Sequence, residues 1–429
     1  MKKTTLLFLG LFFTVMMQAG SNQTNLTVVS TAGGLAAAIT TAGGNINTVT
    51  NLTVTGTIDA WDFKDMQLNM PVLAVLNLSG ATIAHYSGTG GTASTDNISY
   101  AANEIPAWAF SNPNTGQSKA SLTSIILPTS LISIGENAFF NCGYLTSLTI
   151  PPLVTTIRAS AFFNCVGLKS ITIPTLVTSI ENLAFANCSG LSSITIPVSV
   201  TYIGVNAFKS TALITVDAGN SNYSSLAGIL FNKTKTNLIT CPTSKTGSYT
   251  IPSTVTSIGD YSFYNCIGLS SITIPASVTA IGNSAFEGCT GLTTINTYAT
   301  TPVSLTSVTS VFLDVNTATC TLHVPVGSLA TYQGAAQWSD FTINTIADLV
   351  ISGVNNATVT ALSLYPNPAT DGFSIQAGEK ASTISIYDLS GSLVLSQQII
   401  GKSYINISSL QQGVYVVKAD GLVGKLVKK

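Results

Sequence analysis

The sequence carries very little charge. Asp, Glu, Lys and Arg make up only 8% of its 429 residues, and the formal net charge is −1. A chain this neutral lacks the basic surface that nucleic-acid binding requires and has no attraction for anionic lipids. Its mean hydropathy of +0.44 is typical of membrane proteins. Beyond the N-terminal leader, however, no apolar run approaches the roughly eighteen residues of a transmembrane helix, so we expect no membrane span once the leader is removed.

Histidine is almost absent, because His85 and His323 are the only two in the chain. Neither belongs to a Cys-x-x-Cys or His-x-x-x-His arrangement, so we predict neither a metal nor a cofactor. The two histidines lie at opposite ends of the predicted fold, where a serine–histidine contact is improbable. We interpret the cluster of Asp59, Asp62 and Asp65 as solvated turns rather than as paired catalytic acids. The sequence therefore predicts a protein that is not an enzyme and has no catalytic residue.

A 23-residue repeat fills the middle of the chain. Cys142, Cys165 and Cys188 recur at this step, and Cys266 and Cys289 resume it after a gap. The phenylalanines follow it too, at Phe139, Phe162, Phe185, Phe208, Phe263 and Phe286. Such a repeat is the signature of a solenoid, in which neighbouring copies stack because one copy cannot bury its own apolar residues.

One segment of each copy has the pattern of a strand. Residues 145–150 read Leu-Thr-Ser-Leu-Thr-Ile, the Leu-x-x-Leu-x-Leu form of a leucine-rich repeat. The second leucine and the isoleucine share one face of the strand, and Thr149 takes the other. Elsewhere in the copy, Gly135 is expected to make a tight corner. The predicted fold class is mainly β: a leucine-rich repeat solenoid of 23-residue repeats with a parallel sheet, followed by a small immunoglobulin-like β-sandwich.

The five cysteines of the repeat are predicted to stack in a column along the solenoid. Neighbouring strands lie about 4.8 Å apart, whereas a disulfide prefers Cβ atoms about 3.8 Å apart. We therefore expect buried, free thiols, with a disulfide as the alternative.

The repeat has one long interruption, since Phe208 and Phe263 are separated by more than two steps of the repeat and by no whole number of steps. Two short apolar segments within it, 229–231 and 238–240, have turn residues between them, which predicts a β-hairpin. We expect this insertion, at about 217–249, to project from the regular surface. It either carries function, as irregular loops often do, or is a tolerated spacer.

The rest of the chain divides by composition. Two lysines, an apolar run and the small residues Ala19 and Gly20 follow the order of a secretory signal peptide. Short alternating segments after residue 362 predict the β-sandwich. Trp338 and Phe341 are expected to close the solenoid as part of a short helix. The predicted domains are a signal peptide at 1–19, an N-terminal cap at 20–103, the solenoid at 104–296, a C-terminal cap at 297–346, a linker at 347–361 and a terminal domain at 362–429.

The outward positions of the predicted sheet form the candidate binding surface. They carry hydroxyls and almost no charge, which suits wide and shallow recognition in which no single residue dominates. The alternative is that each residue only solvates the sheet. The candidate ligand-facing residues are Thr146, Thr149, Lys169, Thr172, Ser192, Thr195, Ser270 and Thr273.

Two resemblances to known families rest on these motifs. The recurring Ile-Pro-x-x-Val-Thr-x-Ile-Gly, followed by Phe and Cys, at 251–266 and 274–289 resembles the repeats of BspA-like leucine-rich repeat surface proteins. The interrupting hairpin also resembles one found in that family. The terminal domain resembles the type A C-terminal sorting domain of type IX secretion. The residues that carry this second match are Tyr365, Pro366, Asn367, Pro368, Gly391, Gly413, Tyr415 and Lys425.

These resemblances imply a location and a role. The sorting domain implies Sec export and then passage through an outer-membrane translocon to the outer cell surface of a Gram-negative bacterium. The BspA-like repeats imply adhesion, meaning non-catalytic binding to host proteins, extracellular matrix or neighbouring cells. A passive surface coat without a specific ligand is the alternative. The expected partners are therefore such surface or matrix proteins and the type IX secretion machinery, with no nucleic acid.

Overall fold

A computed structural model of the chain describes residues 24–93, 98–305, 308, 310–346, 362, 364–376, 382–388, 393–419 and 422–429. The chain forms two compact units that divide between Leu349 and Val350. The predicted signal peptide and the predicted linker lie outside the described residues. Strands far outnumber helices in both units, so the predicted mainly β class is confirmed.

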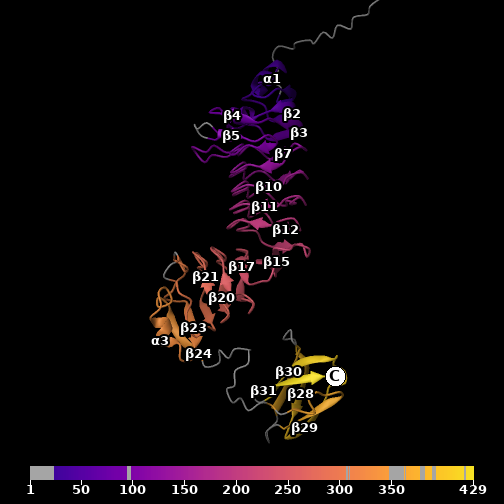
Figure 1. Ribbon diagram of the computed structural model, residues 1–429, viewed down its shortest axis with the longest axis vertical. Coiled ribbons are helices and arrows are strands. Elements are labelled where there is room, and N and C mark those ends of the chain that lie inside the picture. The colour runs from indigo at the N-terminus through magenta and orange to yellow at the C-terminus, as the bar shows by residue number, and fades with distance from the viewer. Residues whose placement is uncertain are drawn as a thin grey trace, which may run out of the picture. The chain divides into compact units, whose positions relative to one another are not determined.

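The first unit is a stack of coils (Figure 1). On one wall of the stack the strands pair in parallel in three successive sheets, here together called ladder A, with breaks between β9 and β12 and between β14 and β18. Ladder A contains the Leu-x-x-Leu-x-Leu segments, and its side chains alternate between buried and exposed because successive residues of a strand face opposite sides. The predicted parallel sheet is thereby confirmed. Its strands are β1 (Asn25–Ser30), β2 (Asn51–Ile58), β3 (Val75–Ile83), β7 (Ser124–Ile126), β9 (Ser147–Thr149), β12 (Ile194–Ile196), β14 (Ile214–Val216), β18 (Gly247–Thr250), β20 (Leu269–Ile274), β22 (Thr294–Thr297), β23 (Thr321–Pro325) and β24 (Thr342–Ile346).

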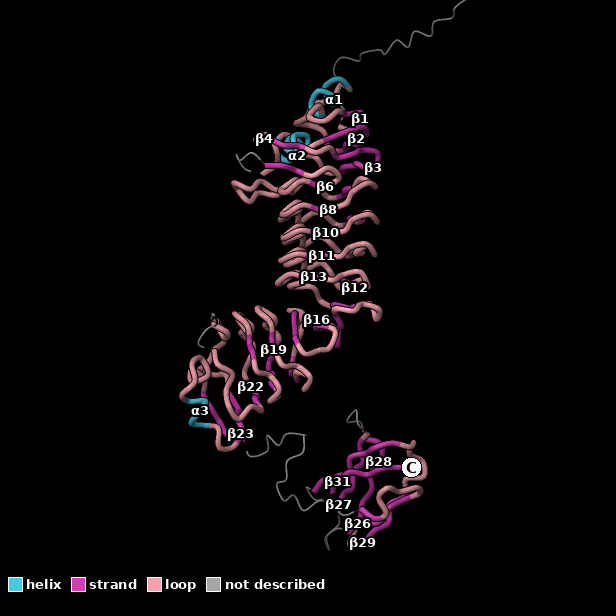
Figure 2. The backbone as a smooth tube through the Cα atoms, in the orientation of Figure 1, coloured by secondary structure: helices cyan, strands magenta, loops and turns pink. Residues whose placement is uncertain are grey.

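A second parallel ladder, ladder B, follows the Ser-Ile-Gly segments, where the sequence predicted only a tight corner (Figure 2). Gly135 does not have the positive φ of such a corner. A Cβ atom added to it would instead lie 2.4 Å from the carbonyl oxygen of Ile105. The corner interpretation is wrong, because glycine is needed where the backbone of the preceding coil passes closely. The regular strands of ladder B are β6 (Glu104–Ile105), β8 (Ser133–Ile134), β10 (Thr156–Ile157), β11 (Ser179–Ile180), β13 (Tyr202–Ile203), β19 (Ser257–Ile258) and β21 (Ala280–Ile281).

The phenylalanines and cysteines of the repeat form the third wall of each coil. The rings of Phe139 and Phe162 stack with centroids 5.1 Å apart and planes 2° apart, and Phe185 continues the column at 5.2 Å. All seven cysteines of the chain are buried, as expected for the repeat cysteines, and all have free thiols. The Cys165 thiol donates to the carbonyl of Phe139 at 3.1 Å, so the cysteine column also joins successive coils.

Two helices and a small hairpin close the N-terminal end. They are α1 (Leu35–Thr41), α2 (Ala60–Leu68), β4 (Tyr86–Gly88) and β5 (Ile98–Tyr100). The carboxylate of Asp62 accepts hydrogen bonds from the backbone N–H groups of Gly33, Leu35 and Asp59 at 2.8, 2.8 and 2.9 Å. Asp59 and Asp62 are buried. Their interpretation as solvated turns is therefore wrong, because they hold the two helix starts together.

The C-terminal end is closed by aromatic side chains. Trp338 and Phe341 are buried, as expected, and the indole N–H of Trp338 donates to the carbonyl of Val303 at 2.9 Å. The helix is placed differently from the prediction, since α3 (Leu329–Gln333) ends before both residues. The closing rings are held by this buried contact and by ring packing on Phe312.

The insertion forms three strands within the stack. They are β15 (Tyr223–Leu226), β16 (Ile229–Asn232) and β17 (Asn237–Thr240), with β16 antiparallel to both neighbours and β17 parallel to β19. Ile229, Leu230 and Phe231 are completely buried. The expectation that the hairpin projects from the surface is therefore wrong, because these side chains belong to the core. Leu230 packs in the core that precedes the insertion, whereas Ile229 and Phe231 pack in the core that follows it.

The second unit holds a three-stranded and a four-stranded sheet around one core. The first sheet contains β25 (Leu364–Tyr365), β26 (Gly372–Gln376) and β29 (Lys402–Asn406). The second contains β27 (Ser382–Tyr387), β28 (Leu393–Ile399), β30 (Gly413–Ala419) and β31 (Leu422–Lys428). The immunoglobulin-like character of this unit stays a prediction.

Candidate functional site

The eight candidate ligand-facing residues lie on the outward side of the coils that carry ladder A. Six of them are exposed, and Ser270 and Thr273 are half-buried. The sheet beneath them is less regular than predicted. Residues 168–174, which contain Lys169 and Thr172, form no strand between β9 and β12.

Several hydroxyls on this face are used by the fold itself. Thr146 donates to the carbonyl of Thr123 at 3.3 Å, and the hydroxyls of Thr195 and Thr215 lie 2.9 Å apart. The Thr273 hydroxyl accepts from the side-chain amide of Asn296 at 3.3 Å. These three candidates therefore contribute to joining neighbouring coils, which sequence reasoning did not predict.

A hollow of about 470 Å³ opens on the same face across three successive coils. It contains two of the candidates, Thr149 and Thr172, and it adds residues that sequence reasoning missed. Chief among these are Ser124, Ser147 and Ser170, which recur at the step of the repeat and therefore stand in one row. The repeat step could have identified this row, because it occupies the other outward position of the same strands.

The floor of the hollow has an irregular backbone. Residues 170–173 make no backbone hydrogen bond to either adjacent coil within the described part of the chain. The preceding strand pair is regular, since Ile125 and Leu148 are partners in the parallel pairing of β7 with β9. The hollow thus lies where the parallel hydrogen bonding of ladder A is interrupted, and backbone N–H and C=O groups of residues 170–173 lack protein partners.

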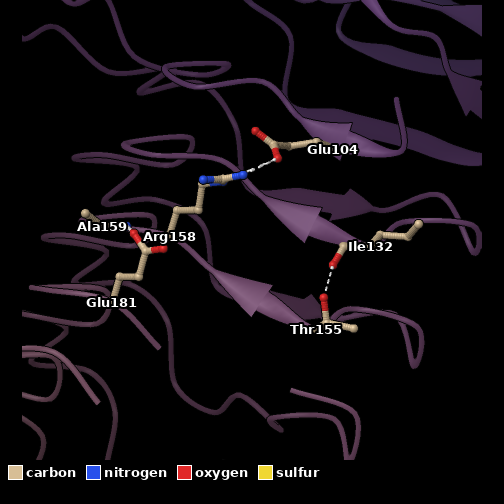
Figure 3. A network of polar contacts seen from close by, with 6 residues as sticks. All are labelled: Glu104, Ile132, Thr155, Arg158, Ala159 and Glu181. Atoms are coloured by element: carbon tan, nitrogen blue, oxygen red, sulfur yellow. Dashed lines mark hydrogen bonds and ion pairs between the residues drawn. The ribbon is translucent and has the colours of Figure 1, made fainter. Parts of the chain in front are cut away.

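The hollow is electrically neutral. None of its lining residues is ionisable, and Lys169 is the only charged residue among the eight candidates. Among the described residues the one ion pair lies on ladder B instead, where Arg158 Nη2 is 3.2 Å from Glu104 Oε2 (Figure 3). Glu181 accepts from the backbone of Ala159 at 3.0 Å beside it. The ion pair therefore lies on a different wall of the solenoid from the hollow.

A serine–histidine contact does occur, contrary to expectation. His85 Nε2 lies 3.0 Å from Ser99 Oγ, beside the antiparallel pair formed by β4 and β5. Both residues are exposed, and no carboxylate orients His85 within the described residues. The contact therefore lacks the third member of a hydrolytic triad. His323 lies far along the chain on β23, where burial lowers its pKa.

The structure shows no metal-binding group of three or more His, Cys, Asp or Glu side chains in its described part. Burial raises the pKa of the Cys142 thiol to about 12 and that of Cys320 to about 11, which disfavours the thiolate form that binds metals at these two residues. Among the described helices, none has the length and apolar character to cross a bilayer.

The residues of the predicted sorting motif come together in the second unit. Asn367 donates through its side-chain amide to the carbonyl of Lys425, and its Oδ1 accepts from the backbone N–H of Val427 at 2.8 Å. The segment that contains Tyr365, Pro366 and Pro368 is thereby tied to the last strand, β31. Gly413 and Tyr415 lie on the neighbouring strand β30, whereas Gly391 falls outside the described residues.

Comparison with known proteins places both parts of the chain. Residues 103–237 and 241–331 match the family described as BspA type leucine rich repeat region, in six copies. Residues 363–429 match the family described as secretion system C-terminal sorting domain. No curated protein matches the chain.

Several solved bacterial structures are similar to the chain. A leucine-rich repeat protein from Eubacterium ventriosum is 28% identical, with a TM-score of 0.37, and the match covers 49% of this chain and 68% of that one. A leucine rich cell surface protein from Faecalibacterium prausnitzii is 22% identical, with a TM-score of 0.42 and coverages of 68% and 82%. A leucine-rich repeat protein from Bacteroides ovatus is 22% identical, with a TM-score of 0.34 and coverages of 64% and 82%. On the strength of its family matches, this chain belongs to the BspA-type leucine-rich repeat proteins and ends in a type IX secretion sorting domain.

Proposed function

We propose that this protein is a non-catalytic adhesion module that binds host proteins, extracellular matrix or neighbouring cells. The observation that carries the proposal is the neutral, hydroxyl-lined face of ladder A with its hollow across three coils. A solenoid presents such a face as an extended surface, which suits binding to large partners. The repeat family and the sorting domain indicate a secreted or cell-surface protein of a Bacteroidetes-type bacterium, where such partners are within reach.

The proposed route to the surface uses both ends of the chain. Residues 1–19 act as a Sec signal peptide, and residues 362–429 engage the type IX secretion machinery after export across the inner membrane. The linker at 347–361 joins the caps and solenoid of 20–346 to this sorting domain. The pairing of Asn367 with β31 supports a sorting unit whose motif and last strand are presented together.

The adhesion proposal is tested by applying the purified full chain to arrays of matrix proteins, host-cell surface proteins and whole neighbouring bacteria. Saturable binding to at least one of them is the expected result. Absence of saturable binding to all of them would indicate the passive surface coat instead.

The export proposal is tested separately by deleting residues 362–429 and fractionating the producing cells. We expect the truncated chain to accumulate in the periplasm. A milder variant, Asn367→Ala, removes the bonds to β31 and is expected to lower surface display while leaving the solenoid folded. Unchanged display of the deletion variant would refute the route without affecting the adhesion proposal.

A further inference from the structure

We infer that the hollow on ladder A receives an uncharged, extended polypeptide segment rich in Ser, Thr, Gly and small apolar residues. This inference rests on the proposed binding function and names the chemistry of its partner. Its volume of about 470 Å³ is within the usual range of binding pockets. It is open and spans three coils, so a segment lying across the strands matches it better than a compact ligand.

The absence of charge in the lining selects the partner. A lysine or a carboxylate brought into this hollow would lose part of its water without meeting an opposite charge among the lining residues, which is unfavourable. The hydroxyls of Ser124, Ser147 and Ser170 have no hydrogen-bond partner among the described residues. They can donate and accept, so they suit the amide and hydroxyl groups of a neutral segment.

The apolar part of the lining also fits a polypeptide. Ile126 is 53% exposed at the hollow, and Pro151 and Pro152 form part of its wall. Small apolar side chains such as valine or alanine can cover these groups and gain hydrophobic stabilisation. A sugar ring is usually held against an aromatic face, and the lining contains no aromatic residue. A neutral polysaccharide is therefore the less favoured occupant.

The serine row supplies the polar complement for the main chain of the segment. A peptide that crosses the strands offers a donor or acceptor about every 3.3 Å along its length, and the hydroxyls of Ser124, Ser147 and Ser170 can pair with such groups. Residues 170–173, which make no backbone hydrogen bond to either adjacent coil, lie beside this row. Hydrogen bonds to the serine row then provide affinity, while the uncharged walls provide selectivity.

The test selects binders from a random peptide display library on the immobilised full chain. We expect the enriched peptides to be depleted in Asp, Glu, Lys and Arg. Binding of an enriched peptide should change little between about 0.05 and 0.5 M salt, because charge pairs do not contribute. On binding, amide hydrogen exchange should slow at 170–173.

Matched variants locate the site. Ser147→Glu places a carboxylate in the hollow and should weaken binding about tenfold or more, which corresponds to about 1.4 kcal/mol. Ser271→Glu makes the same change on β20, since Ser147 and Ser271 hold equivalent positions in the repeat, and it should leave binding unchanged. Circular dichroism checks that both variants remain folded.

The inference is wrong if no peptide is enriched, if the enriched peptides are charged, or if Ser147→Glu and Ser271→Glu bind equally well. Binding of dextran that Ser147→Glu abolishes would assign the hollow to a neutral polysaccharide, and binding of heparin there would assign it to a polyanion. Each of these outcomes leaves adhesion standing if the arrays show saturable binding elsewhere on the chain. Failure of all array binding, in contrast, refutes the proposed function itself.

Discussion

At the scale of single residues, small polar side chains join neighbouring coils through hydrogen bonds, a role that ion pairs can have in more charged proteins. The hydroxyls of Thr155, Thr178 and Thr201 each donate to a carbonyl of the preceding coil, at 3.4, 3.4 and 3.2 Å. The thiols of Cys165 and Cys188 do the same at 3.1 and 3.0 Å. Because hydroxyls and thiols supply these hydrogen bonds between coils, the repeat does not depend on ion pairs to join them. This agrees with the low content of charged residues in the chain.

Asn220 is the residue on which the insertion most depends. Its side chain is fully buried and makes four hydrogen bonds, donating to the carbonyls of Pro197 and Val200 and accepting from the N–H groups of Asn222 and Tyr223. Asn220→Leu removes the side-chain partner of the Val200 carbonyl and of the N–H groups of Asn222 and Tyr223, whereas the Pro197 carbonyl keeps the N–H of Val200 at 3.3 Å. The substitution should lower the free energy of unfolding by about 3 kcal/mol or more. Urea titration measures the change. The exposed neighbour Ser221→Leu serves as control, and equal loss in both variants would contradict this role.

Lys119 predicts an unusual dependence of stability on pH. Its side chain is 5% exposed and donates to the carbonyl of Met70, and burial lowers its pKa from the ordinary 10.5 to about 8. The unfolded chain therefore holds this proton between pH 8 and 10.5 while the folded chain has released it, so this group adds stability as pH rises through that window. The total effect is about 3 kcal/mol at most.

Comparison with Lys119→Met isolates this effect. Buried thiols away from Lys119, such as Cys320, whose pKa burial raises to about 11, act in the opposite direction above pH 9, but they are present in both proteins. The protein with Lys119 gains stability as pH rises from 8 to 10.5, and the methionine variant lacks this gain. The free energy of unfolding of Lys119→Met minus that of the unsubstituted protein should therefore decrease over this range in thermal unfolding experiments. A constant difference between the two proteins would show that Lys119 keeps its ordinary pKa.

At the scale of strands and coils, the repeat step was sufficient to predict the features that recur from copy to copy. The stacked phenylalanines, the buried cysteines and the alternation around Thr149 follow from spacing and periodicity alone. Features that depend on contacts between different coils were not predictable. Gly135 looked like a corner because the backbone that crowds it belongs to residues 105–107, an earlier coil.

The candidate site likewise depends on contacts that could not be predicted from the sequence. The outward position of its residues follows from strand alternation, but the hollow lies where hydrogen bonding is interrupted at 170–173, whose sequence Ser-Ile-Thr-Ile is as strand-like as that of any other copy. The contact of His85 with Ser99 was missed because a hairpin brings together residues that no motif connects. The burial of Asp62 depends on N–H donors 27 and 29 residues earlier in the chain.

The phenylalanine column offers a test of the third wall with two adjacent residues. Phe162 is fully buried between Phe139 and Phe185, whereas Phe163 is half-buried and stacks on Phe140 at 5.0 Å. Phe162→Ala should lower the free energy of unfolding by about 3–5 kcal/mol, because it leaves a cavity in the core. Phe163→Ala should lower the free energy of unfolding by clearly less in the same denaturation experiment. Equal costs would mean that the two rings contribute to the core alike.

At the scale of the whole molecule, the described residues of the solenoid contain two hydrophobic cores that meet at the adjacent strands β16 and β17. Leu230 on β16 packs in the first core and the half-buried Ile239 on β17 packs against it, whereas Ile229, Phe231 and Leu238 pack in the second. Stacked repeats communicate through nearest neighbours, so a division of the core at these strands lowers the cooperativity between the two halves. Unfolding in urea should therefore show two transitions.

Adjacent substitutions assign these transitions. Leu230→Ala should shift the transition of the residues before the insertion, and Phe231→Ala that of the residues after it, each by about 2–5 kcal/mol. Hydrogen-exchange mass spectrometry in urea follows peptides from each half separately. A single transition that both variants shift alike would contradict the division into two cores.

The join at β16 and β17 also determines how the protein responds to mechanical force. In the proposed adhesive role, tension on a bound partner would be carried along the solenoid and across this join, where the hydrophobic core is divided. One half of the solenoid can then lengthen while the other stays folded, so the bond to the partner is spared a sudden rise in tension. The interruption in the repeat would thus limit the peak force on the bond to the partner. Single-molecule stretching should record two separate extensions rather than one.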